Sequence, residues 1–434
     1  RMTTQVLSNH GLKFDFVDTT DTQNIKETIK PETKWVFIET PTNPMLEVTD
    51  IAAVSKICKE SNIKFAVDNT FMSPFGQRPI EHGADCVMHS TTKFIGGHSD
   101  VLGGVLVAKD KELADKLHFI QKSGGAKAFA DSLIDMVGRL PEAFPNLFAP
   151  AGTPSEVKEN FEKELISLPL GMENGAPIES DLANVKYFFD RGIRYITLTH
   201  SLDNEICDSS YDTSEDTWDG LSPFGEQVVQ EMNKWGIMID VSHISDKAFY
   251  DIMNLTQAPV IASHSSCRKF TPGFMRNMND DMIKLLAEKE GVIQINFGSS
   301  FLSKTSQDQF SEIKISLDEY RAAEGLSEND STYVAYATQY LIDMDPFEEI
   351  KTVADHIDHV VAIAGIDYVG LGSDFDGVGN SLPKGLKDVS MYPNLIYELL
   401  MRGYSDEDIE KICSQNVFRV WEETLRVASK IQTL

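Results

Sequence analysis

In the C-terminal part of the chain, six strand-like segments each end in a polar side chain. They are LISLPLGME, IRYITLTH, IMIDVSH, PVIASH, GVIQINF and YVGLGSD. They end at Glu173, His200, His243 and His264, near Asn296, and at Asp374. Imidazoles suit Zn²⁺, and a carboxylate can bridge two such ions. Metal ions held in this way activate water and polarise a carbonyl group, as amide hydrolysis requires. The segment ends therefore predict a metal-dependent hydrolase site.

The elements that must bring these side chains together alternate along the chain. Amphipathic helical patterns separate the strand-like segments, at residues 180–191, 222–235, 245–255, 279–290 and 347–364. Six β-α units of this kind predict an α/β fold, a partial (β/α)8 barrel of the TIM type, whose functional residues gather at the carboxyl ends of the strands. Residues 302–346 lack strand patterns and predict a helical insertion or lid.

Each of these three histidines, taken alone, could equally be a hydrogen-bonded core residue. The occurrence of all three at strand ends, together with two acidic residues, favours a metal site. His356 and His359 lie in the helical pattern DHIDHV and are expected to be structural residues on a helix face. Cys207 and Cys267 are expected to be loop or core thiols.

The N-terminal part of the chain carries a second group of chemically capable residues. Strand-like segments at 34–40, 64–70, 85–93 and 101–108, with helices at 49–61 and 110–123, predict a parallel α/β sheet. Their ends carry Asn43, Asp68, Ser90, Thr92 and Lys93. Such a lysine can form a Schiff base beside a phosphate-binding shelf, and such an aspartate can hold a pyridinium nitrogen. The alternatives are that Asp68 caps a turn and that Lys93 is solvated.

Charge divides the 434 residues into the same two parts. Residues 1–126 hold 14 basic and 16 acidic side chains, whereas residues 127–434 hold 25 and 51. We therefore expect two domains, 1–126 and 127–434. A net charge of −28 argues against nucleic acid and anionic membranes as partners. Five dispersed cysteines, and the lack of a long apolar segment or an apolar signal core, predict a cytoplasmic protein with no membrane partner.

Residues from about 130 to 434 resemble the membrane (renal-type) dipeptidase family of zinc metallopeptidases. The matching segments are GMENG (171–175), GIRYITLTHSLDN (192–204), LSPFGEQVVQEMNKWGIMIDVSHIS (221–245), APVIASHSS (258–266), RNMNDDMIKLL (276–286), VGLGSDFDGV (369–378) and KDVSMYPNLIYELL (387–400). The resemblance implies Glu173 as a metal-bridging carboxylate, with His243 and His264 as ligands of one zinc ion.

The same resemblance implies roles toward a dipeptide substrate. His200 would face the substrate and stabilise an oxyanion, and Arg276 would pair with the C-terminal carboxylate. Asp374 would contact the substrate amine and move a proton. The His-x-Asp pair that supplies the other zinc ligands in this family is missing, so we expect a one-metal site with impaired activity. The chain does contain His98-Ser99-Asp100, but that triplet belongs to a different motif.

Residues 1–126 resemble the Cys/Met-metabolism family of pyridoxal-phosphate enzymes, which includes cystathionine γ-synthase and γ-lyase. The matching segments are ETPTNP (39–44), VDNTF (67–71), HSTTKFIGGHSD (89–100) and VLGGV (101–105). The resemblance implies a partial aspartate-aminotransferase-like domain with Lys93 as the Schiff-base lysine, Asp68 at the pyridine nitrogen, Ser90 and Thr92 at the phosphate and Asn43 by the 3-hydroxyl. The Gly-rich phosphate loop, a ring-stacking Tyr and the C-terminal domain of this family are missing, so we expect weak cofactor binding.

Three functional hypotheses follow. The first is a zinc-dependent dipeptidase-type hydrolase, and the second is a pyridoxal-phosphate-dependent lyase or synthase of sulfur amino acids. The third is an inactive chimeric fusion of the two segments. Dimerisation is common in both families, so the resemblances also imply a homodimer.

Overall fold

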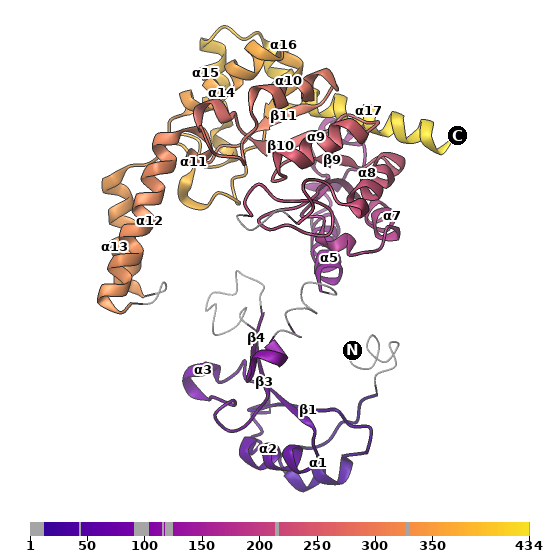
Figure 1. The fold of residues 1–434 in the computed structure, drawn as a ribbon, viewed down its shortest axis with the longest axis vertical. Helices are drawn as coiled ribbons and strands as arrows, with labels where there is room; N and C mark the ends of the chain where they lie inside the picture. The colour runs from indigo at the N-terminus through magenta and orange to yellow at the C-terminus, as the bar shows by residue number, and fades with distance from the viewer. Residues whose placement is uncertain are drawn as a thin grey trace. The chain divides into compact units, whose positions relative to one another are not determined.

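The computed structural model describes residues 13–42, 45–90, 104–114, 117, 125–212, 217–326 and 330–433. Two compact units are distinguished in it, Arg1–Ser123 and Gly124–Leu434 (Figure 1). No described helix combines the length and the apolar character needed to cross a lipid bilayer.

The first unit contains a four-stranded sheet, and two of its helices pack on the sheet. Its strands follow the order β1-β2-β3-β4, with bounds Trp35–Glu39, Lys64–Asp68, Cys86–Ser90 and Gly104–Ala108. Its helices are α1 (Thr22–Thr28), α2 (Ile51–Glu60) and α3 (Ser73–Gly76). Ile25 of α1 and Val54 of α2 pack with Ile38, Phe65 and Val67 of the strands in one core.

The prediction of a parallel sheet is wrong for the last strand of this unit. β1, β2 and β3 are parallel, but β4 runs antiparallel to β3. An antiparallel strand needs no helical crossover, and an apolar run has the same appearance in either direction. Most of the predicted helix 110–123 lies outside the described residues.

The second unit contains a six-stranded parallel sheet with the order β12-β11-β10-β9-β8-β7. From β7 to β12 the strands are Leu170–Glu173, Ile193–Thr197, Met238–Asp240, Ile261–Ser265, Val292–Ile295 and Val369–Leu371. Five of the six predicted segments contain one of these strands, and β10 runs one residue beyond the sixth, to Ser265. Because the sheet is parallel throughout, the carboxyl ends of its strands lie along one edge.

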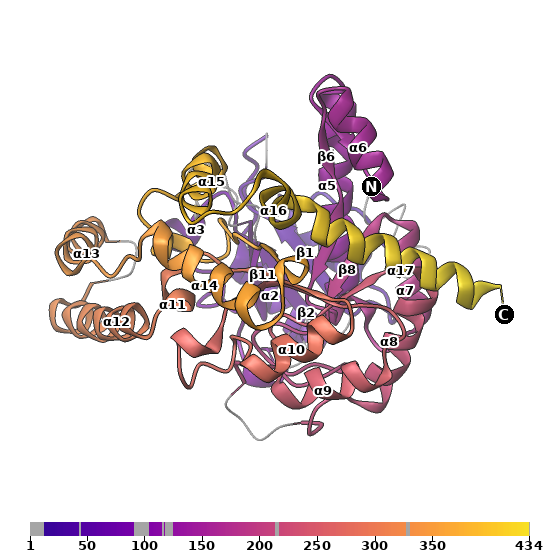
Figure 2. The same cartoon turned by 90° about the horizontal axis from the view of Figure 1, so that it is seen from above.

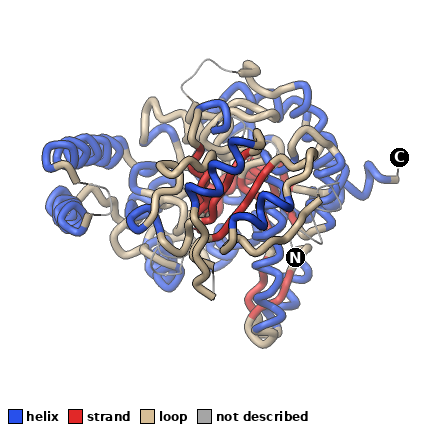
Figure 3. Tube along the Cα trace, turned by 90° about the horizontal axis from the view of Figure 1, so that it is seen from below, coloured by secondary structure: helices blue, strands red, loops and turns tan. Residues whose placement is uncertain are grey.

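The predicted segment 165–173 is two strands rather than one. Proline has no N–H to donate to a ladder, and the segment divides at Pro169 into β6 (Ile166–Leu168) and β7. β6 pairs with β5 (Phe148–Pro150) in a separate two-stranded sheet. Figures 2 and 3 show this pair projecting from the rest of the unit beside α6 (Pro154–Glu162).

Helices follow the strands and cover the sheet at the predicted places. They are α7 (Ala183–Asp190), α8 (Pro223–Trp235), α9 (Asp246–Leu255), α10 (Asp280–Glu288) and α14 (Ile350–Ile363). Ser222, Ser245 and Asn279 begin α8, α9 and α10 by accepting a hydrogen bond from a backbone N–H of the first turn. α8 ends at Gly236, whose φ of 81° favours glycine. These caps explain why the helix bounds could be predicted closely.

The other helices lie at the ends of the unit and in the insertion. They are α5 (Ala126–Ala143), α11 (Ser299–Leu302), α12 (Lys304–Glu324), α13 (Ser331–Met344), α15 (Tyr392–Met401), α16 (Asp406–Glu410) and α17 (Asn416–Gln432). The prediction of a helical insertion at 302–346 is confirmed, because α12 and α13 occupy it. The two helices lie side by side and project from the rest of the unit in Figures 1 and 2.

The expectation that His356 is structural is confirmed. Its ring is fully buried in α14, where Nδ1 accepts a hydrogen bond from the Cys267 N–H and Nε2 donates one to the Leu302 carbonyl. Burial lowers its pKa to about 4, so the ring stays neutral and both nitrogens are satisfied. Cys207 and Cys267 are buried in the same core, as expected for core thiols.

Candidate metal centre

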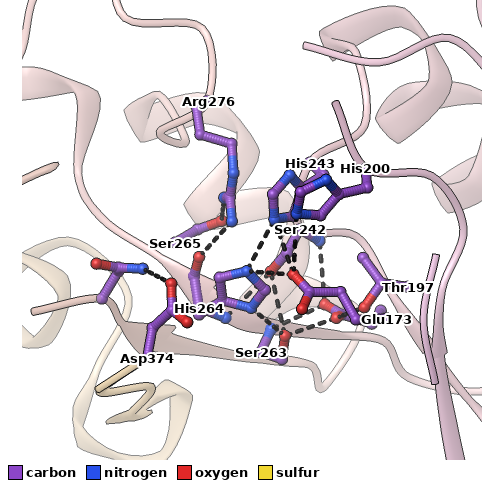
Figure 4. Close-up of polar contacts among 12 residues, drawn as sticks. Glu173, Thr197, His200, Ser242, His243, Ser263, His264, Ser265, Arg276 and Asp374 are labelled. Atoms are coloured by element: carbon purple, nitrogen blue, oxygen red, sulfur yellow. Dashed lines mark hydrogen bonds and ion pairs between the residues drawn. The ribbon is translucent and has the colours of Figure 1, made fainter. Parts of the chain in front are cut away.

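Four side chains from consecutive strands of the six-stranded sheet converge at its carboxyl edge (Figure 4). Oε1 of Glu173 lies 3.1 Å from Nε2 of His243, 3.1 Å from Nε2 of His264 and 3.6 Å from Nε2 of His200. The Nε2 atoms of His243 and His264 are 2.9 Å apart. The His200 ring stacks on the His243 ring with centroids 4.2 Å apart.

Strand ends and short turns position these side chains. Glu173 is the last residue of β7, and His264 lies within β10. The sequence predicts strands that reach His200 and His243, but β8 ends at Thr197 and β9 ends at Asp240. His243 therefore lies in a turn, with a φ of 72° that is uncommon for a residue other than glycine. Backbone strain of this kind is concentrated at functional sites.

The electrostatics keep the acid ionised and the imidazole neutral. The imidazoles of His243 and His264 beside its Oε1 atom hold the pKa of Glu173 well below its ordinary range. Burial lowers the pKa of His243 to about 4. A carboxylate and a neutral imidazole are the forms in which these side chains bind a divalent metal.

The donor set fits a zinc-type ion. One donor atom each from Glu173, His200 and His243 lies within 4.8 Å of the others, and His264 reaches the same Glu173 oxygen. Nitrogen and carboxylate oxygen donors of this kind are typical of Zn²⁺ sites. Nδ1 of His243 is buried and has no hydrogen-bond partner among the described residues. No contact at Nδ1 therefore prevents His243 from binding a metal ion through Nε2.

A buried guanidinium lies beside this cluster. Arg276 is 3% exposed, and it donates hydrogen bonds to Ser265 Oγ at 2.8 Å and to the His264 carbonyl at 2.9 Å. Its Nε has no hydrogen-bond partner, and within the described ranges no carboxylate pairs with it. Burial lowers the pKa of the guanidinium, but an arginine remains charged in proteins. A buried, unpaired cation is suited to binding an anionic group of a ligand.

Asp374 completes the predicted set from the last strand. It follows β12 with a φ of 52°, and its Oδ2 accepts a hydrogen bond from Nδ2 of Asn296 at 2.9 Å. A Cβ at Gly377 would meet Asp374 Oδ1 at 2.0 Å, so any larger residue there would displace the Asp374 carboxylate. Asn296 was expected only as a strand end, and here it orients the Asp374 carboxylate.

Sequence reasoning missed the residues that support the cluster from behind. Asp240 and Ser263 form a hydrogen-bonded pair that reaches Nδ1 of His264. Thr197 donates a further hydrogen bond to Asp240 and does not contact the ligand ring. The ring of Tyr211 lies 5.8 Å from that of His243. A charged residue inside the apolar run IMIDV was an available signal for Asp240, whereas no sequence pattern marks Tyr211.

The candidate pyridoxal-phosphate residues are only partly described. Asn43, Thr92, Lys93, His98 and Asp100 lie outside the described residues. Asp68 ends β2 and Ser90 ends β3, on neighbouring strands. Oδ1 of Asp68 accepts a hydrogen bond from the Thr70 N–H at 3.0 Å, which is the turn-capping role considered as the alternative for this residue.

Comparison with known proteins agrees with this geometry. The family model of the membrane dipeptidases (Peptidase family M19) matches residues 113–434, and that of the Cys/Met metabolism PLP-dependent enzymes matches residues 1–138. An uncharacterised dipeptidase of Schizosaccharomyces pombe is 36% identical over 268 residues, which are 61% of this chain and 55% of the relative. The chain thus spans about half the length of that relative.

Two solved structures are similar to this chain. A metallo peptidase from Rhodobacter sphaeroides, liganded with a phosphinate mimic of the dipeptide L-Ala-D-Ala, is 26% identical with a TM-score of 0.57, covering 70% of this chain and 76% of its own. A probable dipeptidase from Pseudomonas aeruginosa is 23% identical with a TM-score of 0.60, covering 94% of this chain and 98% of its own, and shows the fold alone. With its family model matched over residues 113–434, the chain belongs to the membrane dipeptidase family, Peptidase family M19.

Proposed function

We propose that the second unit is a zinc-dependent hydrolase of dipeptides. The observation that carries this proposal is the convergence of Glu173, His243 and His264, with one carboxylate oxygen 3.1 Å from both imidazole nitrogens. The family membership and the dipeptide mimic bound by the related metallo peptidase support the same substrate class. The unit resembles a partial (β/α)8 barrel in its strand order, and we propose that architecture for it.

Each residue has a proposed task. Glu173, His243 and His264 hold the metal, with His200 placed to assist. When bound, the ion activates a water molecule and polarises the peptide carbonyl. His200, stacked on His243, donates a hydrogen bond to the carbonyl oxygen as negative charge develops there.

The remaining residues bind the two ends of the dipeptide. The Arg276 guanidinium binds the C-terminal carboxylate with charge-assisted hydrogen bonds. Asp374, held by Asn296, binds the substrate amine and carries the proton that the leaving amine needs. In a dipeptide the free amine and the free carboxylate lie on adjacent residues. A site that binds both groups therefore selects dipeptides over longer peptides.

Zinc content and hydrolysis measured together test the proposal. We expect close to one zinc ion per chain, by elemental analysis after dialysis, and hydrolysis of alanyl-alanine that a chelator abolishes. His243→Ala and His264→Ala should lose both, while His82→Ala, which changes a histidine of the first unit, should keep both. Unchanged zinc in the first two variants would refute the metal site. No zinc and no hydrolysis in the unmodified chain would favour an inactive fusion.

A second candidate function concerns the first unit. The match of residues 1–138 to the PLP-dependent family, with Asp68 and Ser90 at neighbouring strand ends, favours a pyridoxal-phosphate site of the sulfur amino-acid lyase or synthase type. We expect a yellow protein after incubation with the cofactor, and we expect Lys93→Ala to lose the visible absorbance. A protein that stays colourless with excess cofactor would remove this candidate.

A further inference from the structure

A buried carboxylate lies behind the metal centre and takes no part in the proposed chemistry. Asp240, the last residue of β9, is fully buried. Its Oδ1 accepts hydrogen bonds from the N–H groups of Ser242 at 3.0 Å and Ser263 at 2.8 Å. Its Oδ2 accepts from Ser263 Oγ at 2.6 Å and Thr197 Oγ1 at 2.5 Å. Within the described part of the chain, no basic side chain pairs with it.

The direction of these hydrogen bonds is fixed by chemistry. An ionised carboxylate only accepts, so the hydroxyl proton of Ser263 points to Asp240. The oxygen of Ser263 can then only accept from Nδ1 of His264, which lies 2.7 Å away. Nδ1 of His264 therefore carries a proton. Its Nε2, which is directed to Glu173 and His243, is the nitrogen that faces the candidate metal site.

We propose that Asp240 is a positioning residue of the metal centre, acting through Ser263 to hold His264 in the tautomer that binds the metal through Nε2. This inference rests on the proposed function, because it assumes that His264 is a ligand. Ligand histidines in metal sites are commonly oriented by an acceptor on their other nitrogen. Here a serine hydroxyl transmits that constraint from a carboxylate on the neighbouring strand.

Asp240→Asn should reverse the direction of the hydrogen bonds that connect residue 240, Ser263 and His264, with little change in side-chain size. The asparagine oxygen can still accept from the N–H groups of Ser242 and Ser263, which places its NH₂ group toward Ser263 Oγ. That hydroxyl then accepts from the amide and donates its own proton to Nδ1 of His264. The ring proton moves to Nε2, where it blocks the lone pair.

Zinc affinity and the tautomer of His264 test the proposal separately from activity. We expect Asp240→Asn to weaken zinc binding by about 10–100-fold in a chelator competition, the usual effect of changing a residue behind a ligand. Nitrogen-15 NMR of the zinc-free chain should show His264 protonated on Nδ1 in the unmodified protein and on Nε2 in the variant. Ser263→Ala should also weaken zinc binding, because it removes the acceptor for Nδ1 of His264. If Asp240→Asn does not fold, Ser263→Ala tests the proposal in its place.

Thr197→Val is the matched control. The substitution removes one hydrogen bond to Asp240 at a fully buried position but leaves Ser263 and His264 in place. Because Ser263 still accepts from the ligand ring, the zinc affinity of the variant should stay within about twofold of that of the unmodified chain. Equal losses in Thr197→Val and Asp240→Asn, or an unchanged His264 tautomer, would overturn the proposal and make Asp240 merely structural. Failure of the proposed function is distinct, because His264→Ala would then leave zinc binding unchanged.

Discussion

Glu173→Gln is expected to remove zinc binding and dipeptide hydrolysis together. Oε1 of Glu173 is the atom on which His200, His243 and His264 converge, at 3.6, 3.1 and 3.1 Å. Glutamine keeps the size of the side chain but loses the negative charge that attracts the ion. Changing a residue that only hydrogen-bonds a metal ligand weakens metal binding by about 10–100-fold. Removing the charge of the ligand itself should therefore lower the zinc affinity by roughly 1,000-fold or more.

Zinc titration and hydrolysis of alanyl-alanine check this expectation. The Glu173 side chain is 45% exposed, so the zinc-free variant should still fold, with a somewhat lower unfolding temperature because it lacks the ionised carboxylate that His243 and His264 stabilise. Glu205→Gln removes one negative charge from another exposed glutamate of the same unit and should keep zinc binding. If Glu173→Gln binds zinc as well as the Glu205 variant does, Glu173 is not a ligand.

The strand ends that carry the candidate metal centre could be predicted from the sequence for a simple physical reason. In a parallel sheet the carboxyl ends lie at one edge, so polar residues after successive apolar runs meet without further information. Glu173 and His264 follow this rule. His200 and His243 meet them although β8 ends at Thr197 and β9 ends at Asp240, because the turns after these strands stack the two rings on each other.

Other features depend on packing that no local pattern contains. Arg276 stands in the polar segment RNMNDD, which reads as an exposed turn, yet its guanidinium is buried between Ser265 and the His264 carbonyl. Only the family resemblance indicated a role for it. Asp240 stands inside the apolar segment IMIDV, and the role proposed for it depends on the mutual register of β8, β9 and β10. The direction of β4 was likewise set by pairing rather than by its own residues.

Arg276→Met is expected to impair substrate binding while leaving the metal in place. We propose that the guanidinium pairs with the substrate carboxylate, and removing one partner of a buried charge pair costs about 2–5 kcal/mol. We therefore expect kcat/KM for alanyl-alanine to fall roughly 100-fold, mainly through a higher KM. Zinc content should match that of the unmodified chain, because the hydrogen bonds of Arg276 go to Ser265 Oγ and to the His264 carbonyl, not to an imidazole ring.

A comparison of substrates separates this role from general damage. The unmodified chain should hydrolyse alanyl-alanine much faster than its C-terminal amide, because the amide has no carboxylate for Arg276 to bind. Arg276→Met should treat the two substrates alike. Arg276→Lys should recover only part of the preference, since an ammonium cannot form the two parallel hydrogen bonds of a guanidinium with a carboxylate. A variant that is slow but still prefers the free carboxylate as strongly would show that another group binds it, and that Arg276 instead supports the His264 backbone.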